Sequence, residues 1–428
     1  MSNAKKFLLV SIDGLISDIG WQLVKEGQDV KYYIGNESDR PIADGFVPKV
    51  DNWEHHIDWA DVIIFDDVLG QGTHAQKLRA AGKNVIGGTP YTDRLEDDRS
   101  FGQNELKQHG VSIIPFHEFS DFDSAIAHVR ANPAPYVIKP SGEAQNIKRL
   151  LFVGQEDDGL DVIHVLESYK AVYADKVKVF QLQRRMRGVE VAVGAFFNGS
   201  TFMQPINVNF EHKLLFPGNI GPATGEMGTC MYWSEPNRLF RQTLAKLESR
   251  LAEEAYVGYI DVNCIVNGNG IYPLEFTARF GYPTIFIQAD GLSMPVHEFM
   301  SGMADGTLTR FKTRRGFQIG VRIVVPPFPY DDPKTFEANS KDRVIIFRKP
   351  DNLEGIHIED VKLVNGQWVI TGRTGVVLVV TGVGSSVKQA QAQAYQRVRN
   401  ILIPNMYYRK DIGDRWFEDH DRLHTWGY

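Results

Sequence analysis

The sequence predicts an α/β protein built from several domains. Three observations support this prediction: apolar runs alternate with helical segments near the N-terminus, a strong hairpin signal lies at 256–284, and strand-like runs with one helical segment follow residue 310. Alternation of strands and helices is typical of a mostly parallel sheet. The chain, with 428 residues, is long enough for roughly two to four domains with substantial cores.

The N-terminal segment is expected to form the parallel sheet. Strands are predicted at 7–12, 30–34, 60–65 and 84–86, with helices at 17–26 and 73–81. Ser17 is a plausible N-cap of the first helix, and Gly27 ends that helix. The loop at 11–17 follows the first strand, so it lies at the carboxyl edge of the sheet, where open α/β sheets bind ligands.

The second half of the chain changes in character near residue 310. An amphipathic helix is predicted at 235–255, and turn-forming and basic residues at 306–316 indicate a domain boundary. Beyond the boundary, strands are predicted at 320–325, 368–371 and 376–380, followed by a helix at 387–402. A further α+β unit therefore follows the central part of the chain.

Composition narrows the class of protein. Hydrophobic residues make up 43% and charged residues 23%, as in an ordinary soluble globular protein, and the net charge of -6 gives no electrostatic reason to expect nucleic acid. The two cysteines, Cys230 and Cys264, cannot build a disulfide framework or a zinc cluster, so a reducing cytoplasm is expected. We see neither a signal peptide nor an apolar run of about 18 residues that would span a membrane.

The hairpin at 256–284 carries the strongest chemical signal. Two apolar strands flank an Asn-Gly-Asn-Gly turn, and side chains alternate along each strand. If the loop is odd-numbered and centred on Gly268, Asp261 lies directly opposite Glu275, with Thr277 on the same face as Glu275. A divalent cation such as Mg²⁺ would relieve the repulsion between the two carboxylates. A hairpin whose polar face meets water fits the same pattern, so the hairpin alone leaves both interpretations open.

Arg279 follows the second strand and adds a cation beside the carboxylates, as phosphoryl transfer requires. Together, Asp261, Glu275 and Arg279 resemble the metal- and phosphate-binding segment of ATP-grasp ligases. The run Glu-Phe-Thr-Ala-Arg-Phe-Gly-Tyr-Pro-Thr at 275–284 resembles that of glycinamide ribonucleotide synthetases (phosphoribosylamine–glycine ligases), in which Asn stands at the position of Thr277.

The resemblance covers nearly the whole chain. The string Gly-Pro-Ala-Thr-Gly-Glu-Met-Gly at 221–228 resembles the acceptor-site segment of the same family. The family relationship implies a Rossmann-like (pre-ATP-grasp) N-domain at 1–98, a two-part α+β ATP-grasp domain at 99–310 and a small C-terminal α+β domain at 311–428. A small lid subdomain is implied at about 134–190.

The resemblance also implies roles for single residues at the nucleotide. Lys139 and Lys148 would contact phosphates, together with Arg99, which stands where the family usually has Lys. Glu190 would hold the ribose. The implied nucleotide-binding residues are Arg99, Lys139, Lys148, Gln183, Arg184 and Glu190, and those implied for Mg²⁺ (or Mn²⁺) are Asp261, Glu275 and Thr277. Lys139 and Arg279 are the implied catalytic residues.

The substrate residues implied by the resemblance lie in three segments. They are Asp13, Gly14, Lys213, Thr224, Gly225, Glu226, Met227 and Arg279. The family has a glycine-rich loop with Arg and His that holds phosphoribosylamine, whereas here only Gly14 is left of that pattern. Glu226 stands where the family has Gly, and a carboxylate at this position would favour a cationic amine.

The implied activity is an ATP-dependent carboxylate–amine ligase that forms an amide through an acyl phosphate, as in purine biosynthesis. Expected partners are a small carboxylate, such as glycine or another amino acid, and an amine acceptor, with the chain a monomer or homodimer. Two alternatives stay open: a relative that joins an amino acid to a different amine, and a nucleotide-binding pseudoenzyme.

Overall fold

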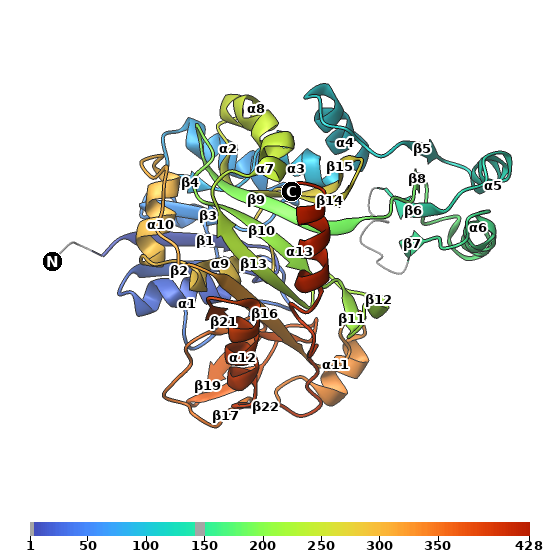
Figure 1. The fold of residues 1–428 in the computed structure, drawn as a ribbon. Helices are drawn as coiled ribbons and strands as arrows, with labels where there is room; N and C mark the ends of the chain where they lie inside the picture. The colour runs from blue at the N-terminus through green and yellow to red at the C-terminus, as the bar shows by residue number, and fades with distance from the viewer. Residues whose placement is uncertain (1–3, 142–149) are drawn as a thin grey trace.

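The computed structural model describes residues 4–141 and 150–428. Its N-terminal part is a parallel sheet in the order β2-β1-β3-β4, which confirms the predicted α/β layer (Figure 1). The elements of this part are β1 (Lys6–Ser11), α1 (Ser17–Lys25), β2 (Asp29–Ile34), the short helical turn η1 (Glu54–His56), β3 (Val62–Phe65), α2 (Gln71–Ala80) and β4 (Val85–Ile86). The strands β1, β3 and β4 are almost wholly buried, as expected for a sheet covered on both faces, whereas the edge strand β2 alternates between buried and more exposed residues.

Ser17 does not cap the first helix, so that prediction was wrong. The N-cap of α1 is Ile16, without a side-chain hydrogen bond. The Ser17 hydroxyl, which is fully buried, instead donates to the carbonyl oxygens of Ile358 and Glu359, each at 3.2 Å. The Ser17 hydroxyl therefore bonds to Ile358, 341 positions away in the chain, instead of capping its own helix.

Two short helices lead from the N-terminal sheet to the rest of the chain. They are α3 (Pro90–Asp97) and α4 (Arg99–Gln108). Thr89 caps α3 through the amide of Thr92, and Asp98 caps α4 by accepting from the amide of Phe101 at 2.9 Å. Arg99, the first residue of α4, is thereby fixed at a helix start.

A small lobe projects from the body of the molecule (Figure 1). Its antiparallel sheet has the order β5-β8-β6-β7, and two helices pack on it around a hydrophobic core of their own. The elements are β5 (Phe116–Phe119), α5 (Phe122–Ala131), β6 (Tyr136–Pro140), β7 (Phe152–Val153), α6 (Leu160–Tyr173) and β8 (Phe180–Arg184). The lobe thus begins before the segment at 134–190 that the sequence indicates as a lid.

The body is built on one antiparallel sheet of eight strands, in the order β15-β14-β9-β10-β13-β16-β21-β18. Its strands are β9 (Val189–Asn198), β10 (Ile206–Glu211), β13 (Gly228–Ser234), β14 (Val257–Asn267), β15 (Gly270–Thr277), β16 (Phe317–Val324), β18 (Ile356–Ile358) and β21 (Val376–Gly384). Because β13 pairs with β16, strands on both sides of residue 310 share hydrogen bonds. A boundary at 310 would therefore divide one continuous sheet.

The remaining elements surround this sheet. They are β11 (Leu214–Phe216), β12 (Ile220–Ala223), α7 (Arg238–Gln242), η4 (Leu244–Leu247), α8 (Glu248–Glu253), α9 (Thr284–Asp290), α10 (Val296–Ala304), α11 (Pro333–Asn339), β17 (Ile346–Phe347), β19 (Val361–Val364), β20 (Gln367–Ile370), α12 (Val387–Val398), β22 (Ile401–Leu402) and α13 (Arg415–Thr425). The single helix predicted at 235–255 is broken at Thr243, whose φ of -125° and ψ of -97° are not helical. Its hydroxyl bonds back to the carbonyl of Leu239 at 2.7 Å.

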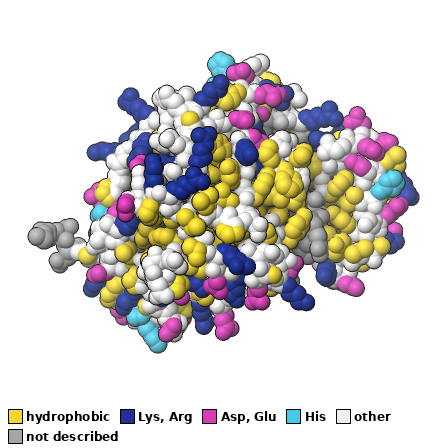
Figure 2. Space-filling view, turned by 90° about the horizontal axis from the view of Figure 1, so that it is seen from below, with side chains coloured by type: hydrophobic (Ala, Val, Ile, Leu, Met, Phe, Trp, Pro, Cys, Tyr) yellow, Lys and Arg dark blue, Asp and Glu magenta, His cyan; other side chains and the backbone are white. Residues whose placement is uncertain are grey.

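The face seen from below mixes charges of both signs. Lys and Arg side chains alternate there with Asp and Glu, and apolar side chains lie between them (Figure 2). Among the described residues, no helix has the length and apolar character needed to cross a membrane.

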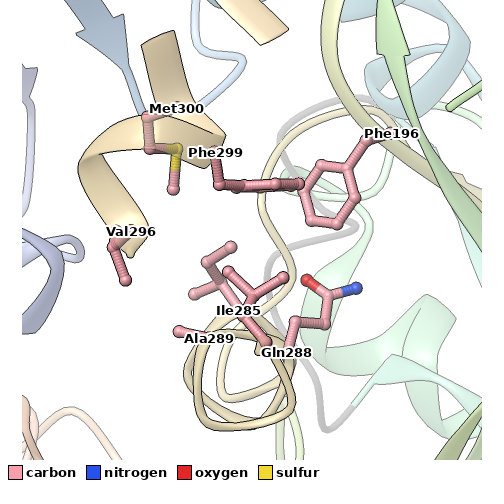
Figure 3. A pocket seen from close by; sticks show the side chains of 8 residues that line it. Phe196, Ile285, Gln288, Ala289, Val296, Phe299 and Met300 are labelled. Carbon is pink, nitrogen blue, oxygen red and sulfur yellow. The ribbon is translucent and has the colours of Figure 1, made fainter. Parts of the chain in front are cut away.

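An apolar pocket lies between α9, α10 and β9 (Figure 3). The residues lining it are Phe196, Ile285, Gln288, Ala289, Leu292, Val296, Phe299 and Met300. Its polar side chain, Gln288, donates to Asn207 at 3.3 Å. None of the sequence-predicted site residues lines this pocket, which belongs to the packing between helices and sheet.

Candidate active site

The hairpin β14–β15 forms, but its register differs from the predicted one. Asp261 lies opposite Thr277, and Asn263 lies opposite Glu275. The prediction that Asp261 opposes Glu275 was wrong for two reasons: the turn has two residues, Gly268 and Asn269, and a bulge between Asn263 and Cys264 shifts the pairing. Directly opposed residues share a face, so the oxygen-bearing side chains still project from one side of the sheet.

Lys213 lies at the centre of the carboxylates on this face. Its ammonium is 3.1 Å from Glu275, 3.2 Å from Glu190 and 3.5 Å from Glu211. Burial opposes the charge, but these carboxylates raise the pKa of Lys213 well above its usual value. Lys213 in turn lowers the pKa of Glu275 far below its ordinary range. Lys213 and Glu275 are therefore both charged at neutral pH.

Lys139, on strand β6 of the small lobe, also belongs to this cluster. It lies near the end of β6 and is 7% exposed. Burial, followed by the positive charge of Arg99, lowers the pKa of Lys139 to about 7, and Glu275 and Glu190 act in the opposite direction. Arg99 itself lies 3.6 Å from Glu275. Three cations thus lie beside the same carboxylates, and cations grouped in this way are suited to binding a polyphosphate.

The strand β8 joins the small lobe to this cluster. Gln181 lies opposite Lys139 and donates to the hydroxyl of Ser100 at 2.8 Å. Two further predicted nucleotide-binding residues follow on the same strand: Gln183 is buried and Arg184, the last residue of β8, is exposed. Lys148, the third predicted phosphate contact, falls outside the described residues.

Asp261, the predicted metal ligand on β14, is a buried carboxyl group with an unpartnered oxygen. It is 2% exposed, and its Oδ1 has no hydrogen-bond partner. Burial and the nearby charge of Glu211 raise its pKa well above the usual value. The described residues hold no group of three or more His, Cys, Asp or Glu placed to bind a metal unaided. Asp261, Glu275 and Thr277 fit Mg²⁺ in the other common arrangement, in which one or two carboxylates act together with substrate phosphates.

Arg279 connects the hairpin to the N-terminal sheet. Its guanidinium lies 3.2 Å from Glu96 and 3.8 Å from Asp67, and it donates to the carbonyl of Phe280 at 2.8 Å. Burial opposes its charge, but Glu96 and Asp67 raise the pKa of Arg279 further above its usual value. The predicted catalytic cation is thus held between two carboxylates, at the junction of the two parts of the molecule.

The glycine-rich loop after β12 packs against the same cluster. Both the amide and the hydroxyl of Thr224 bond the carbonyl of Lys213, each at 2.8 Å, and Gly225 is exposed. Glu226 is buried, accepts from the hydroxyl of Thr229 and, because of that burial, has a pKa well above the usual value. Met227, predicted to contact substrate, is fully buried in a small apolar cluster and supports the loop from beneath.

The first loop holds the two remaining predicted substrate residues. Gly14 has a φ of +82°, a left-handed conformation that favours glycine, and its amide donates to the hydroxyl of Ser11 at 2.7 Å. Asp13 accepts from Asn36 at 3.2 Å. This loop adjoins Asp67 rather than the lysine cluster, since the charge of Asp13 acts on the pKa of Asp67.

Several residues of the site were not identified from the sequence. Glu211 contacts Lys213, and Asn263 donates to Glu211 at 3.3 Å. Asn263 could have been included, because it shares a strand face with Asp261. Glu211 stands two residues before the predicted substrate residue Lys213, in a string that resembles the family's acceptor-site segment, but its contact with Lys213 could not be inferred from the sequence alone.

Comparisons with known proteins agree with this geometry. Residues 97–285 match the family model of the phosphoribosylglycinamide synthetase ATP-grasp (A) domain, and residues 329–415 match that of the phosphoribosylglycinamide synthetase C domain. A phosphoribosylamine–glycine ligase of Streptococcus pneumoniae is 26% identical over 96% of this chain and 99% of its own length. Another from Yersinia pestis is 26% identical over 79% of both chains.

Solved structures share the fold. A crystal structure of phosphoribosylamine–glycine ligase from Thermotoga maritima superposes with a TM-score of 0.70 at 21% identity, covering 95% of this chain and 100% of that one. The biotin carboxylase domain of the 2-oxoglutarate carboxylase of Hydrogenobacter thermophilus, in complex with MgADP, gives a TM-score of 0.64 at 13% identity, covering 99% of both chains.

Fold and site together define the class: this is an ATP-grasp protein, an ATP-dependent ligase of the type that forms C–N bonds. The two family models describe parts of one enzyme type, and together they cover more than half of the chain. The chain belongs to the phosphoribosylglycinamide synthetase family.

Proposed function

We propose that this chain joins the carboxylate of glycine, or of another small amino acid, to an amine through an acyl phosphate. The observation that carries the proposal is the cluster in which Lys139, Arg99 and Lys213 surround Glu275 and Glu190. Fixed cations of this kind stabilise a transferring phosphoryl group, because they are already oriented before the reaction begins.

The reaction would proceed in two steps. A carboxylate oxygen of the amino acid attacks the γ-phosphorus of ATP, the bond to the β-phosphate oxygen breaks, and ADP leaves. The neutral amine then attacks the acyl carbon, a C–N bond forms, and the C–O bond breaks with its electron pair leaving on phosphate. Lys139 and Arg99 would hold the nucleotide phosphates, Lys213 would orient Glu275 and Glu190, and Glu190 would accept a ribose hydroxyl.

Mg²⁺ would neutralise charge on the phosphates and would be held by Asp261 and Glu275, with Thr277 opposite Asp261 supplying a hydroxyl oxygen. The unpartnered Oδ1 of Asp261 supports this assignment. Arg279 would stabilise the acyl phosphate on the side of the N-terminal sheet.

The relatives' name gives phosphoribosylamine as the amine, and this is the first candidate acceptor. A different amine is the second candidate, since carboxylates rather than cations dominate the carboxyl edge of the N-terminal sheet. A chain that bound ATP without ligase activity would be a third possibility, to be excluded by experiment.

Release of ADP tests the proposal. The full chain, ATP, Mg²⁺ and glycine are incubated with hydroxylamine, which captures an acyl phosphate as a hydroxamate and so replaces the unknown amine. We expect glycine-dependent hydroxamate and ADP in equal amounts. Phosphoribosylamine and other amines are then compared as acceptors. Absence of ADP and hydroxamate with a full panel of amino acids would support nucleotide binding without ligation.

A further inference from the structure

Acidic residues collect at the carboxyl edge of the N-terminal sheet. Asp13 follows β1, Asp39 follows β2, and Asp66 and Asp67 follow β3 directly. Asp360, from the segment after β18, joins them, since the charge of Asp39 acts on its pKa. We call these five residues the acidic edge. The carboxyl ends of parallel strands are where open α/β sheets bind ligands.

The cations near the acidic edge do not balance it. Arg373 lies 3.4 Å from Asp39 and 3.8 Å from Asp13, and Arg279 lies 3.8 Å from Asp67. Within the described ranges, Asp66 and Asp360 have no cation at ion-pair distance. Burial raises the pKa of Asp66 well above its usual value and that of Asp360 to about 8, so these two are largely protonated at neutral pH. The remaining three carboxylates still outnumber the two guanidinium groups, so a phosphate would meet repulsion here and an ammonium attraction.

Asp66 is the member of the acidic edge that is fully buried without a hydrogen-bond partner. It is 0% exposed, and neither of its carboxylate oxygens has a hydrogen-bond partner. Burial raises the pKa of Asp66, and the charges of Asp67 and Asp13 raise it further. The carboxyl group of Asp66 is therefore close to the other acids of the edge. A buried carboxyl group without a partner is costly, and a bound cation would remove that cost.

The acidic edge adjoins the predicted nucleotide site. Tyr282, three residues after Arg279, donates its hydroxyl to the carbonyl of Asp66 at 3.1 Å. Arg279 itself lies between Asp67 and Glu96, and the charge of Asp261 acts on it. A ligand at the acidic edge would therefore lie next to Arg279, the cation proposed to stabilise the acyl phosphate.

We propose that the acceptor is a small cationic amine without a phosphate group, bound at the acidic edge by Asp13, Asp66 and Asp67. This inference rests on the proposed ligase function and specifies its second substrate. One ammonium is held by the acidic edge. A second amino group, after giving its proton to a carboxylate of the site, attacks the acyl phosphate, so that an amide forms and phosphate leaves.

A matched set of amines tests the inference in the full chain with ATP, Mg²⁺ and glycine. Butane-1,4-diamine, butylamine and 4-aminobutyl phosphate present the same reactive amine with a positive, neutral or negative distal end. We expect kcat/KM for the diamine to exceed that for the aminoalkyl phosphate by at least about tenfold. A preference for the phosphate compound, or equal rates for all three, would overturn the inference.

Substitutions in the acidic edge test whether its residues cause the preference for the diamine. In Asp66→Asn and Asp13→Asn, the rate with the diamine relative to the rate with hydroxylamine should fall about tenfold, while the exposed control Asp351→Asn keeps the wild-type ratio. Asp13→Asn decides the question if Asp66→Asn does not fold, because Asp13 is only half buried. An unchanged ratio in the folded variants would contradict the inference. Failure to form hydroxamate with any amino acid would instead overturn the ligase function, and this inference with it.

Discussion

Lys213 and Glu275 show how single residues set up the site. The ammonium of Lys213 contacts three carboxylates, and Glu275 also lies near Arg99. Each of these partly buried charges therefore has partners of opposite sign, which reduces the penalty of removing it from water. Glu275 consequently stays ionised over the whole physiological range, as a ligand of Mg²⁺ must.

Glu275→Gln should lower the rate of ATP turnover by about 10²–10³-fold, the loss typical when one electrostatic group acting on a transition state is removed. The amide keeps the size of the side chain, so we expect circular dichroism and melting temperature to stay near those of the wild type. The exposed Glu298→Gln serves as the matched control and should retain activity. Wild-type turnover in Glu275→Gln would remove this carboxylate from the mechanism.

Lys139 should make nucleotide binding depend on pH. Its pKa is lowered to about 7 in the free protein, and a bound phosphate would favour the charged form and raise that pKa. Binding then takes up a proton above pH 7, so affinity for ATP should weaken as pH rises from 7 to about 8.5, by up to tenfold per pH unit.

The matched variant is Lys139→Arg, whose guanidinium keeps its charge throughout this range. Calorimetric titration of both proteins with ATP at several pH values isolates the contribution of Lys139. We expect a flatter profile for the variant. Parallel profiles would show that Lys139 does not titrate in this window.

At the scale of elements, the pairing of β9 with β14 places the acids. Gly194 lies opposite Asp261 in this pairing. A methyl group at Gly194 would come within 2.9 Å of the Cβ of Asp261 and would collide with the hydroxyl of Tyr259. That hydroxyl is held by Asn207 at 2.9 Å, so the ring cannot move aside freely. Because Gly194 on β9 has no side chain, there is space for Asp261 on the neighbouring strand β14.

Gly194→Ala should lower the free energy of unfolding by about 1–3 kcal/mol, as overpacking of a tight core does, and should also weaken Mg²⁺-dependent ATP turnover by displacing Asp261. Gly268→Ala is the control, because a methyl group there would lie 3.5 Å from Trp426 in ordinary contact. Chemical unfolding and turnover assays measure both effects. Equal stability and activity of the two variants would refute this account of the β9–β14 packing.

The same elements show how far sequence reasoning reaches. Apolar runs that alternate with helical segments predicted the parallel N-terminal sheet, and two apolar strands around an Asn-Gly-Asn-Gly turn predicted the β14–β15 hairpin, because these patterns and turn residues are local properties. The register of the hairpin was missed, since a bulge at Asn263 depends on packing that local patterns do not encode. The acidic edge was also missed apart from Asp13, because its members are brought together only by the sheet.

At the scale of the whole molecule, the first helix is bound to the strand β18, far along the chain. Asp18 on α1 is fully buried and accepts from the ring of His357 at 2.7 Å and from the amide of Ile358 at 3.0 Å. Ser17 contacts the same segment. The N-terminal sheet is thereby held against β18, at the edge of the eight-stranded sheet.

Asp18→Ala should lower the free energy of unfolding by about 1–3 kcal/mol, because it leaves a buried amide and a buried imidazole without their partner. Differential scanning calorimetry compares it with Asp331→Ala, an exposed control that should be close to the wild type. A melting profile for Asp18→Ala that matches the control would show that this contact does not hold the two parts together.

The central claim is that this chain forms an acyl phosphate from ATP and a carboxylate. Glycine labelled with ¹⁸O in its carboxylate, incubated with the full chain, ATP, Mg²⁺ and a reactive amine, tests this claim most directly. Mass spectrometry of the released phosphate should show one ¹⁸O atom per turnover, because the attacking carboxylate oxygen leaves with phosphorus. Unlabelled phosphate released together with amide product would contradict the account.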